Sequence, residues 1–508
     1  MEDRSDPVSG PEFMQPSSRL DVATLPAAND GLCVPTYPLD AIGIGIVHLG
    51  PGAFHRAHQA EFVDRLLAGD PQWGICAVSL RTSGLRDALQ PQQGLYTVAI
   101  LDEQVSYRVV GALREVLVAP EDCERVLQRM AAAQTRIVTL TVTEKGYCLD
   151  THGELDRSHP DIVHDIASPQ APVSAIGYLV EALRRRHAAG HAPFTTISCD
   201  NLVDNGMRLR DAVVRLAEAQ HDTPLAEWVS KNAAFPRTMV DSIVPATDDA
   251  LRHRTASVLG VQDAWPVQRE SFTQWVIEDR FCNDRPDFAS VGVTLTNDVP
   301  AYVRAKLRLL NGAHSSLAYL GLLMGHQSVG EAMADTDLAA FLRWLMIEDI
   351  RPTLTAPPGL DLAAYIDEIL QRFRNPTIRH ELAQIAWDGS QKLPFRLFGT
   401  ILDHLAGGHP IERLCLPVAA WMHFVRRRAQ AGEKLVDPLA EQLLAIGRQC
   451  VNDVAHDLPL FLALDSVFPR QLGNDSRFID ALAQAYDCLR VKPELIGRVL
   501  RETHVSVR

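Results

Sequence analysis

The feature that most constrains the fold is an alternation of apolar strands and helices over residues 42–201. Residues 42–52, IGIGIVHLGPG, read as a buried strand that ends in a glycine turn, and residues 53–70 have helical periodicity. The pattern indicates further strands at residues 73–80, 135–147 and 194–201, and an amphipathic helix at residues 173–190. Strands that alternate with helices predict a parallel sheet covered by helices. Residues 14–297 are therefore predicted to form an α/β, Rossmann-like dinucleotide-binding domain with a mostly parallel sheet.

The pattern changes after about Pro300. Residues 298–508 read almost entirely as helix, with loops at TAPPGLD (355–361) and FRNPT (373–377). We predict an all-helical C-terminal domain for substrate binding and catalysis. Residues 1–13, MEDRSDPVSGPEF, look like a cloning remnant and are left out of the fold prediction.

Charge and cysteine content limit the class of protein. The formal net charge of −14 argues against binding to nucleic acid or to an anionic membrane, because both need a basic surface. An anionic substrate would need a local group of cations. The nine cysteines form no C-x-x-C pair, no apolar run approaches a membrane span, and the N-terminus lacks signal-peptide features. These observations predict a reduced, cytoplasmic protein.

The glycine turn at residues 50–55, GPGAFH, is a candidate cofactor site. Glycines after a first strand allow the backbone to approach a pyrophosphate at the start of a helix. We therefore predict that Gly50, Gly52, Ala53 and Phe54 bind a nicotinamide dinucleotide. His55 replaces the third glycine of the usual fingerprint, and a plain tight turn is the alternative.

The end of the second strand bears on the choice of cofactor. An acidic residue there would bind the ribose hydroxyls of NAD, but this chain has Ser79, Leu80 and Arg81. Arg81 can meet the 2′-phosphate of NADP or stand as a solvated side chain. We expect NAD, with NADP left open.

The segment AKLRLLNGAHSSLAYLGLL, residues 305–323, places three polar residues on an apolar helix. At about 100° per residue, Asn311 lies about 140° and His314 about 80° from Lys306, so all three can face one cavity. A buried lysine with a lowered pKa can act as general acid/base without a metal, and no residue spacing indicates a zinc site. The alternative is a buried helix whose lysine reaches solvent and whose polar groups are hydrogen-bonded.

A second motif overlaps this segment. Tyr302 and Lys306 have the Y-x-x-x-K spacing of the short-chain dehydrogenases, in which the tyrosine is the acid and lies in the α/β domain. Here the pair opens the predicted helical domain, and we treat the match as accidental.

Six motifs carry a resemblance to a known family. They are, in chain order, IVHLGPGAFHRAHQA, TLTVTEKGY, SCDN, FPRTMVDSIVP, FTQWVIEDRF and KLRLLNGAHSSLAYLG. Over roughly residues 40–490 the chain resembles the polyol-specific long-chain dehydrogenases, the mannitol dehydrogenase family. The resemblance implies a metal-independent hydride transfer with a nicotinamide cofactor, in a monomer or weak homo-oligomer.

The resemblance also assigns residue roles. It implies that Lys306 is the general acid/base and that Asn201 and Asn311 hold the substrate oxygen as it becomes an alkoxide, which suits amide donors. His314 would position the reacting hydroxyl, and Asp241 would line the same pocket. The structural alternatives are an Asn201 that caps a turn and an Asp241 that pairs with an arginine.

Two further positions concern the proton path. Glu144 follows the third strand near the expected nicotinamide, where it would contact cofactor or guard a proton path, unless it is a surface glutamate. Many relatives carry a glutamate three residues before the catalytic lysine, whereas this chain has Val303, so its proton path must differ.

The segment RNPTIRHELAQIAWDGSQKLPFRL, residues 374–397, bears on the substrate. Mannitol dehydrogenases generally have an arginine at the position of Gln384. The chain has DGSQKLP and an Arg379–His380 pair, and with TVTEKGYCLD and SAIGYLVEALRRR it resembles the fructuronate reductases, also called mannonate oxidoreductases, which implies reversible reduction of D-fructuronate to D-mannonate. A uronate carries a carboxylate that is best met by arginine or lysine. Arg379, His380 and Lys392 are the candidates for binding it, solvated helix charges are the alternative, and Arg374 and Arg396 rank below them.

The expected reaction is thus the interconversion of D-fructuronate and D-mannonate. One alternative is a polyol dehydrogenase acting on mannitol or arabinitol, or a tagaturonate reductase of the same family. The other is a nucleotide-binding sensor that does not catalyse, which would have no use for Lys306, Asn311 and His314.

Overall fold

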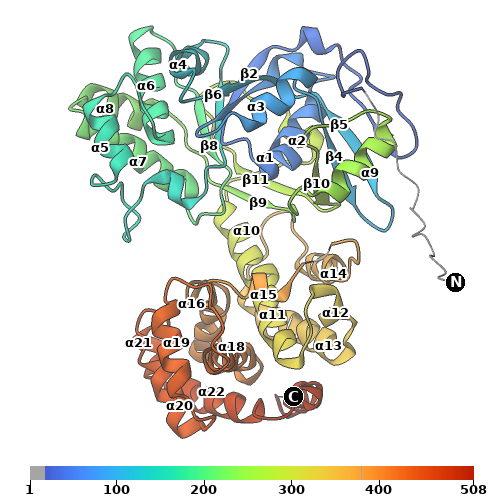
Figure 1. The fold of residues 1–508 in the computed structure, drawn as a ribbon. Coiled ribbons are helices and arrows are strands. Elements are labelled where there is room, and N and C mark those ends of the chain that lie inside the picture. The colour runs from blue at the N-terminus through green and yellow to red at the C-terminus, as the bar shows by residue number, and fades with distance from the viewer. Residues whose placement is uncertain (1–17, 379, 508) are drawn as a thin grey trace, which may run out of the picture. The chain divides into compact units, whose positions relative to one another are not determined.

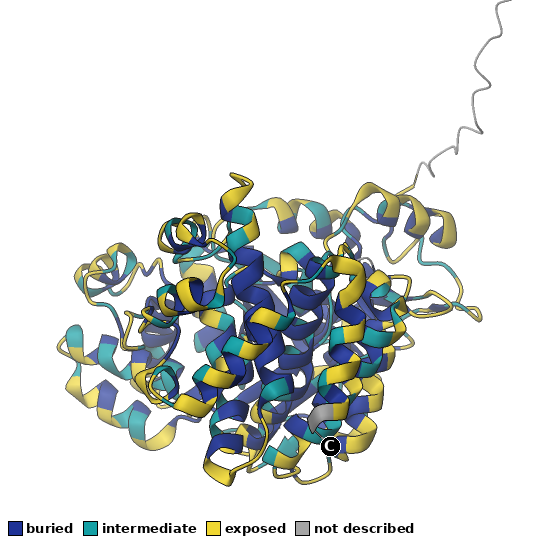
Figure 2. Ribbon diagram, turned by 90° about the horizontal axis from the view of Figure 1, so that it is seen from below, coloured by how far each residue is buried: buried dark blue, intermediate teal, exposed yellow. Residues whose placement is uncertain are grey.

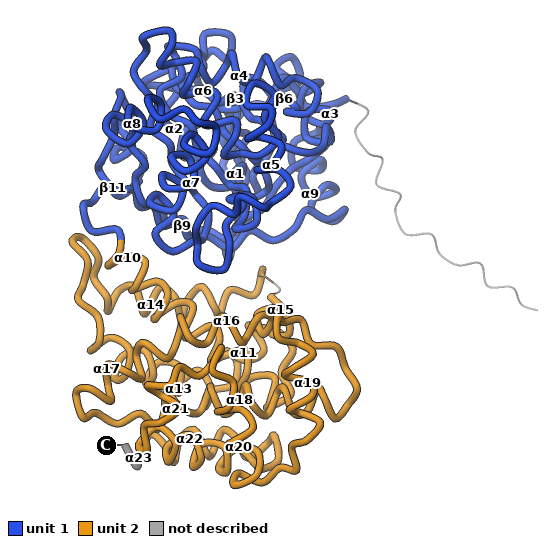
Figure 3. The backbone as a smooth tube through the Cα atoms, turned by 90° about the vertical axis from the view of Figure 1, so that its left-hand side faces the viewer, with its two compact units in different colours: residues 1–299 blue, residues 300–508 orange. Residues whose placement is uncertain are grey.

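The computed structural model describes residues 18–378 and 380–507, so the predicted remnant at residues 1–13 and the candidate Arg379 lie outside the described residues. The chain divides into two compact units, residues 1–299 and 300–508 (Figure 3). The predicted fold class is confirmed: the first unit is α/β and the second is helical (Figure 1). No helix in the described part of the chain combines the length and apolarity needed to cross a membrane.

The centre of the first unit is a five-stranded parallel sheet. Its spatial order is β6 (Leu113–Val118), β3 (Gly74–Ser79), β2 (Ile44–Leu49), β7 (Ile137–Leu140) and β8 (Thr195–Ser198). Counted along the chain, this is the order 3-2-1-4-5 of a dinucleotide-binding fold. The chain therefore reverses its winding direction at β2 and β7, and ligands bind such sheets outside the carboxyl ends of the strands at this point.

Both faces of this sheet are buried, which explains its continuous apolar strands. On β3, Ile75 and Ala77 belong to one core cluster, and Cys76 and Val78 belong to the other. Figure 2 shows helices of the molecule that are dark blue where residues are buried and yellow where they are exposed. The helices of the unit are α1 (Ala53–Ala57), α2 (Gln59–Leu66), α3 (Gly84–Leu89), α4 (Cys123–Ala131), α5 (Pro160–Ala167), α6 (Ala175–Ala188), α7 (Asn205–Ala219), α8 (Thr223–Asn232) and α9 (Asp249–Leu259).

Two smaller sheets complete the first unit. One has the order β1 (Leu32–Cys33), β5 (Ser106–Val110), β4 (Tyr96–Leu101), β10 (Val267–Glu270), and the other β12 (Thr294–Thr296), β11 (Gln274–Glu278), β9 (Thr238–Asp241). Each contains an antiparallel pair, β4 with β5 and β9 with β11.

Two local predictions for this unit were wrong in detail. The helix expected at residues 53–70 is broken at His58, whose φ and ψ are −125° and −88°. The His58 ring lies 3.0 Å from the Gln274 carbonyl oxygen and stacks on Phe54, so tertiary contacts override the helical periodicity. The strand expected at residues 135–147 ends at Leu140, and a 3₁₀ turn occupies Glu144–Tyr147.

The second unit is helical, as predicted. Its helices are α10 (Val299–Ala305), α11 (Gly312–Met324), α12 (Val329–Ala334), α13 (Thr336–Trp344), α14 (Leu362–Phe373), α15 (Leu382–Ile385), α16 (Gly389–Leu393), α17 (Gly399–Gly407), α18 (Glu412–Gln430), α19 (Ala440–Gln449), α20 (Val454–Leu462), α21 (Arg470–Gly473), α22 (Ser476–Cys488) and α23 (Ile496–Val507). The long helix α18 packs against α11, α19 and α22. Segments Lys306–Asn311, Leu345–Ile350 and Pro394–Phe398 are π-helical, a rare conformation that often occurs at functional sites.

One buried side chain joins the end of β8 to the start of β9. The Asn205 amide nitrogen donates to Thr238 Oγ1 at 2.9 Å and to the Asp200 carbonyl at 3.2 Å. Its oxygen accepts from the backbone amides of Gly206 and Thr238 at 2.8 and 3.0 Å. This network fixes the backbone that leads to Asn201.

Replacing Asn205 with alanine should destabilise the first unit. The change leaves buried polar groups without partners, so the free energy of unfolding should fall by about 1–3 kcal/mol or more. Urea denaturation measures this, with Asn232→Ala as the matched control. Asn232 is exposed and donates only to the Trp228 carbonyl among the described residues, so its loss should stay within about 0.5 kcal/mol. Equal effects of the two changes would show that the Asn205 network is not structural.

Candidate functional site

The first unit brings the predicted cofactor residues to the carboxyl ends of β2 and β7. Gly50 follows β2 with φ +85°, and an added Cβ there would collide with the Thr141 carbonyl oxygen. The Thr141 hydroxyl donates to the Gly50 carbonyl at 2.7 Å, so the two loops are joined. Gly52 then caps α1, which begins with Ala53 and Phe54. This glycine turn without side chains fits the close approach of a pyrophosphate.

His55, in place of the third glycine, packs against the sheet. Its ring stacks on that of His48 with centroids 3.4 Å apart. His48 Nδ1 lies 2.7 Å from Thr139 Oγ1 and Nε2 lies 2.9 Å from Thr141 Oγ1. Burial lowers the pKa of His48 to about 3 and that of His55 well below its usual value, so both rings are neutral at pH 7. Because both rings are uncharged, His55 can stack on His48 at the position where the usual fingerprint has a glycine.

Asp200 holds the loops after β7 and β8 together. Its carboxylate accepts from the backbone amides of Val142 and Thr143 at 3.0 and 2.9 Å and from the Tyr147 hydroxyl at 2.8 Å. Burial raises the pKa of Asp200 above its usual value. Thr143 has φ +63°, which is rare for a residue with a side chain and marks local strain.

Asp200 was not among the predicted site residues. The sequence could have indicated Asp200, because it stands beside Asn201 at the polar end of a predicted strand. Glu144 and Asn201 are exposed on the two loops that Asp200 connects, whereas Asp241 is buried at the end of β9. Arg81 is exposed after β3 and makes no ion pair with the described residues.

In the second unit, Lys306 and Asn311 bound a π-helical turn. The Gly312 amide donates to the Leu307 carbonyl, five residues back. The expectation of a regular helix with 100° steps is therefore wrong over this segment. A π-turn has more residues per turn, so Lys306 and Asn311, five residues apart, lie closer to one face than the regular helix places them. Lys306 is only 8% exposed.

Tyr302, the acid of the rejected short-chain motif, is engaged elsewhere. Its hydroxyl donates to the Pro358 carbonyl at 2.5 Å, and burial raises its pKa above the usual value. Both observations argue against a role as an acid near neutral pH.

Cations surround His314. Burial lowers its pKa well below the usual value, and His380, Arg396, Arg372 and Lys392 lower it further, in that order. The rings of His314 and His380 lie 5.0 Å apart between centroids. His314 Nε2 is buried and has no hydrogen-bond partner among residues 18–378 and 380–507, so it is available to a ligand.

Arg396 stands out in this group. It lies in the π-helical segment 394–398 and donates to Ser315 Oγ at 2.8 Å and to the Asn311 carbonyl at 3.4 Å. It has no carboxylate partner in the described part of the chain, and burial lowers its pKa to about 10. Lys392 lies 3.9 Å from the Asp388 carboxylate, and burial lowers its pKa too. Buried cations normally have carboxylate partners, so Arg396 in particular is suited to an anionic ligand.

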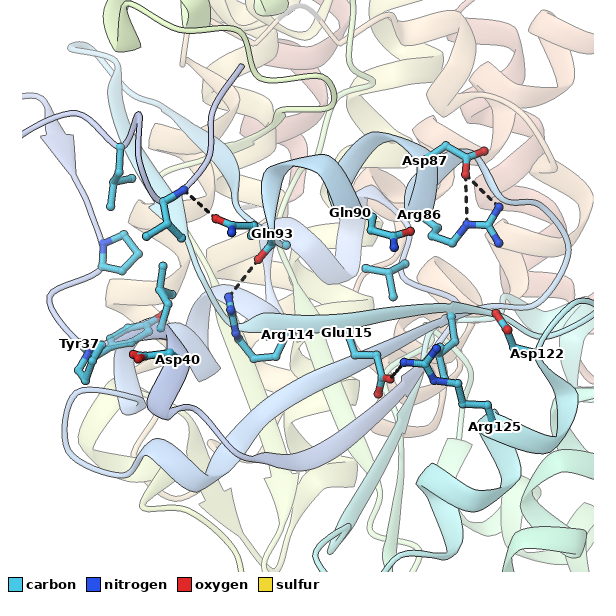
Figure 4. Close-up of a pocket in the computed structure, with 18 residues that line it drawn as sticks. Tyr37, Asp40, Arg86, Asp87, Gln90, Gln93, Arg114, Glu115, Asp122 and Arg125 are labelled. Atoms are coloured by element: carbon cyan, nitrogen blue, oxygen red, sulfur yellow. Dashed lines mark hydrogen bonds and ion pairs between the residues drawn. The ribbon is translucent and has the colours of Figure 1, made fainter. Parts of the chain in front are cut away.

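A cavity of about 1180 Å³ in the first unit lies elsewhere (Figure 4). It runs along β6, the edge strand of the parallel sheet, and none of the predicted site residues lines it. Its arginines are already engaged: Arg86 with Asp87, Arg125 with Glu115, and Arg114 with the Gln93 carbonyl. Arg114 donates only to backbone carbonyls and has no carboxylate partner among the described residues, so it is the place of the cavity, apart from every predicted site residue, that separates it from the candidate site.

Comparison with known proteins gives consistent matches along the chain. Residues 44–290 match the Mannitol dehydrogenase Rossmann domain, and residues 298–490 match the Mannitol dehydrogenase C-terminal domain. The chain is 42% identical to a D-mannonate oxidoreductase of Escherichia coli, over 92% of this chain and 98% of the relative. It is 40% identical to a mannitol 2-dehydrogenase of Phaeosphaeria nodorum, over 93% and 84%.

A solved structure agrees with these matches. The Pseudomonas fluorescens mannitol 2-dehydrogenase, in a ternary complex with NAD and D-mannitol, superimposes with a TM-score of 0.80 at 36% identity. The match covers 96% of this chain and 99% of that one.

Replacing Gly50 with alanine should damage both the turn and cofactor binding. A left-handed alanine alone costs about 1–2 kcal/mol, and the collision with Thr141 adds to this cost. Gly190→Ala is the matched control, since Gly190 also has a positive φ, +69°, but open space around its Cα. Thermal melting and dinucleotide titration should show a larger loss for Gly50→Ala. Indistinguishable variants would exclude a close backbone approach at Gly50.

Proposed function

Because this chain belongs to the mannitol dehydrogenase family of oxidoreductases, we propose that it interconverts D-fructuronate and D-mannonate with a nicotinamide cofactor. The observation that carries the choice of substrate is the pair of half-buried cations near His314. Arg396 has no carboxylate partner among the described residues, and a uronate would supply the missing carboxylate. The D-mannonate oxidoreductase relative supports the same choice.

NAD is the proposed cofactor. The similar Pseudomonas fluorescens structure holds NAD, and the glycine turn at Gly50 leaves room for a pyrophosphate. Exposed Arg81 keeps NADP as the alternative, because it is free to meet a 2′-phosphate. We place the reaction in the cytoplasm, where nine free thiols stay reduced, and in a monomer or weak homo-oligomer.

The proposed mechanism follows the residue roles that the family implies. When bound, the nicotinamide supplies the hydride for ketone reduction and accepts it in the reverse direction. The amides of Asn201 and Asn311 donate to the substrate oxygen as negative charge develops on it. Protonated Lys306 gives its proton to that oxygen, and the alcohol returns the proton in the reverse direction.

The remaining assignments concern substrate orientation. His314 Nε2 hydrogen-bonds the reacting hydroxyl, and Asp241 lines the same pocket. Lys392 and Arg396 hold the carboxylate, with His380 beside His314. Arg379 remains a candidate for the same role but lies outside the described residues.

A polyol dehydrogenase is the second candidate. It is favoured by the mannitol 2-dehydrogenase relative and by the solved mannitol complex, which are about as similar to this chain as the mannonate enzyme is. Oxidation of reduced nicotinamide, followed by absorbance with D-fructuronate, D-tagaturonate and D-fructose and with NADH or NADPH, separates the candidates. We expect strong turnover of fructuronate with NADH. Equal or faster reduction of fructose would establish a polyol dehydrogenase, and cofactor binding without any turnover would indicate a sensor.

Replacing Lys306 with alanine should remove the general acid. Since such a group contributes about 10²–10⁴ to the rate, kcat should fall by this factor while the dissociation constant for the cofactor stays nearly unchanged. Steady-state kinetics and fluorescence titration with NADH measure the two quantities. Full turnover in the variant would exclude Lys306 as the acid.

Replacing Arg396 with glutamine should separate charged from neutral substrates. The KM for fructuronate should rise at least about tenfold, as expected when a charge-assisted hydrogen bond of about 1.5–3 kcal/mol is lost. The KM for fructose should change little. Exposed Arg448→Gln is the control and should change neither. A parallel loss for both ketoses would show that Arg396 acts by holding Ser315 and Asn311 rather than the carboxylate.

A further inference from the structure

Three potential metal ligands of different types meet in the first unit, in the segment that follows the Glu144–Tyr147 turn. They are Cys148, His159 and Asp161. One ligand atom from each, the thiol sulfur, an imidazole nitrogen and a carboxylate oxygen, lies within 4.8 Å of the other two. Cys148 is buried, and the other two residues are half-buried. None of them has a role in the proposed hydride transfer.

The backbone holds these side chains in place. Cys148 has φ +51°, and its carbonyl accepts from the Asp156 amide at 2.8 Å. A bridge between Leu149 and Leu155 closes the loop that returns the chain toward α5. His159 caps α5, with its Nδ1 accepting from the Asp161 amide at 3.2 Å. A neutral imidazole that accepts at Nδ1 carries its proton on Nε2, so a metal ion at Nε2 requires that proton to move to Nδ1 and this capping bond to be lost.

The local charge favours a cation. The carboxylates of Asp161, Asp165 and Asp156 act on the Cys148 sulfur, and the Arg81 guanidinium acts against them. Three carboxylates against one cation leave the surroundings of the sulfur net negative. Asp165 is fully engaged with Ser174 and Val173, but Asp161 lies within ligand distance. The positive end of α5 opposes a cation, but that helix is short, and a thiolate with Asp161 supplies two negative charges.

We propose that Cys148, His159 and Asp161 bind one thiophilic divalent cation of the Zn²⁺ class. Sulfur, imidazole and carboxylate form a ligand set that suits tetrahedral zinc, with water in the fourth position. Binding releases the thiol proton to solvent and involves no redox change. The ion ties the segment at Cys148 to the first turn of α5, and so steadies the loop that carries Thr143 and Glu144.

Sequence spacing did not point to this set, because the three residues follow no standard zinc motif. The site goes beyond the proposed function and does not depend on it. The ion takes no part in hydride transfer, so a test of metal binding can fail or succeed whatever the substrate proves to be.

Cobalt binding to the full chain tests the proposal. Chelator-treated protein, freed of chelator, is titrated with Co²⁺, and a thiolate-to-cobalt charge-transfer band is followed in the near ultraviolet. Wild-type protein should develop the band at one equivalent and lose it when Zn²⁺ is added. Cys148→Ser should abolish the band. His159→Asn should weaken cobalt binding at least about tenfold, since losing even a partner of a metal ligand costs 10–100-fold.

Two control variants exclude adventitious binding. Cys33→Ser removes an exposed thiol, and His152→Asn removes an exposed imidazole from the same loop. Both should bind cobalt like the wild type. A second readout guards against misfolded variants: Zn²⁺ should raise the melting temperature of the wild type and of both controls, but not of His159→Asn. Absence of the band in the wild type, or its persistence in Cys148→Ser, overturns the proposal.

Discussion

A parallel sheet that is buried on both faces can offer polar side chains to a ligand only where its strands end. This constraint organises the first unit. The faces of β3 are divided between two apolar cores, and most of the predicted site residues of the unit follow β2, β7 and β8. Asp200 joins the loops after β7 and β8, because its carboxylate accepts hydrogen bonds from two backbone amides and from Tyr147. Thr141 joins the loop after β7 to Gly50. Even the two histidines beside the glycine turn are kept uncharged by the same burial.

In the second unit, the feature that matters most is the group of cations around His314. The chain as a whole has a net charge of −14, yet the surroundings of His314 are cationic. Most arginines of the unit pair with carboxylates, as Arg413 does with Asp349 at 2.7 Å. Arg396 instead uses neutral oxygens, which leaves its charge uncompensated within the described residues. Such an arrangement costs stability and is explained if a ligand anion completes it.

Sequence patterns predicted the parts of this protein that depend on short-range order. Apolar runs located β2, β3 and β8, and the change of pattern near Pro300 separated α/β from helical structure. The glycine turn and the helix of Lys306 were found because their residue types are restrictive. Features set by distant contacts were missed: the break at His58 follows from its contact with Gln274, and Asp200 matters through amides almost sixty positions away.

For Arg396, the sequence showed the residue but could not show its surroundings. Its charge was visible in the sequence, but nothing in the sequence tells which arginines have carboxylate neighbours. The ranking that placed Arg379, His380 and Lys392 above it rested on motif position. The structure describes His380 and Lys392 near His314, adds Arg396 to them, and leaves Arg379 outside the described residues.

The π-helical turn at Lys306–Asn311 has a consequence for how this segment can vary. A π-turn amounts to one extra residue in an α-helix. The side chains of α11 are therefore rotated about the helix axis relative to where a continuous α-helix from α10 would place them. Removing any one residue from positions 307–310 would restore a single phase and rotate Lys306 by about 100° relative to His314. All three polar residues would remain in the chain, and their side chains would no longer share a face. The length of this segment is therefore constrained as tightly as its composition, and an insertion or deletion here is a change of geometry rather than of chemistry.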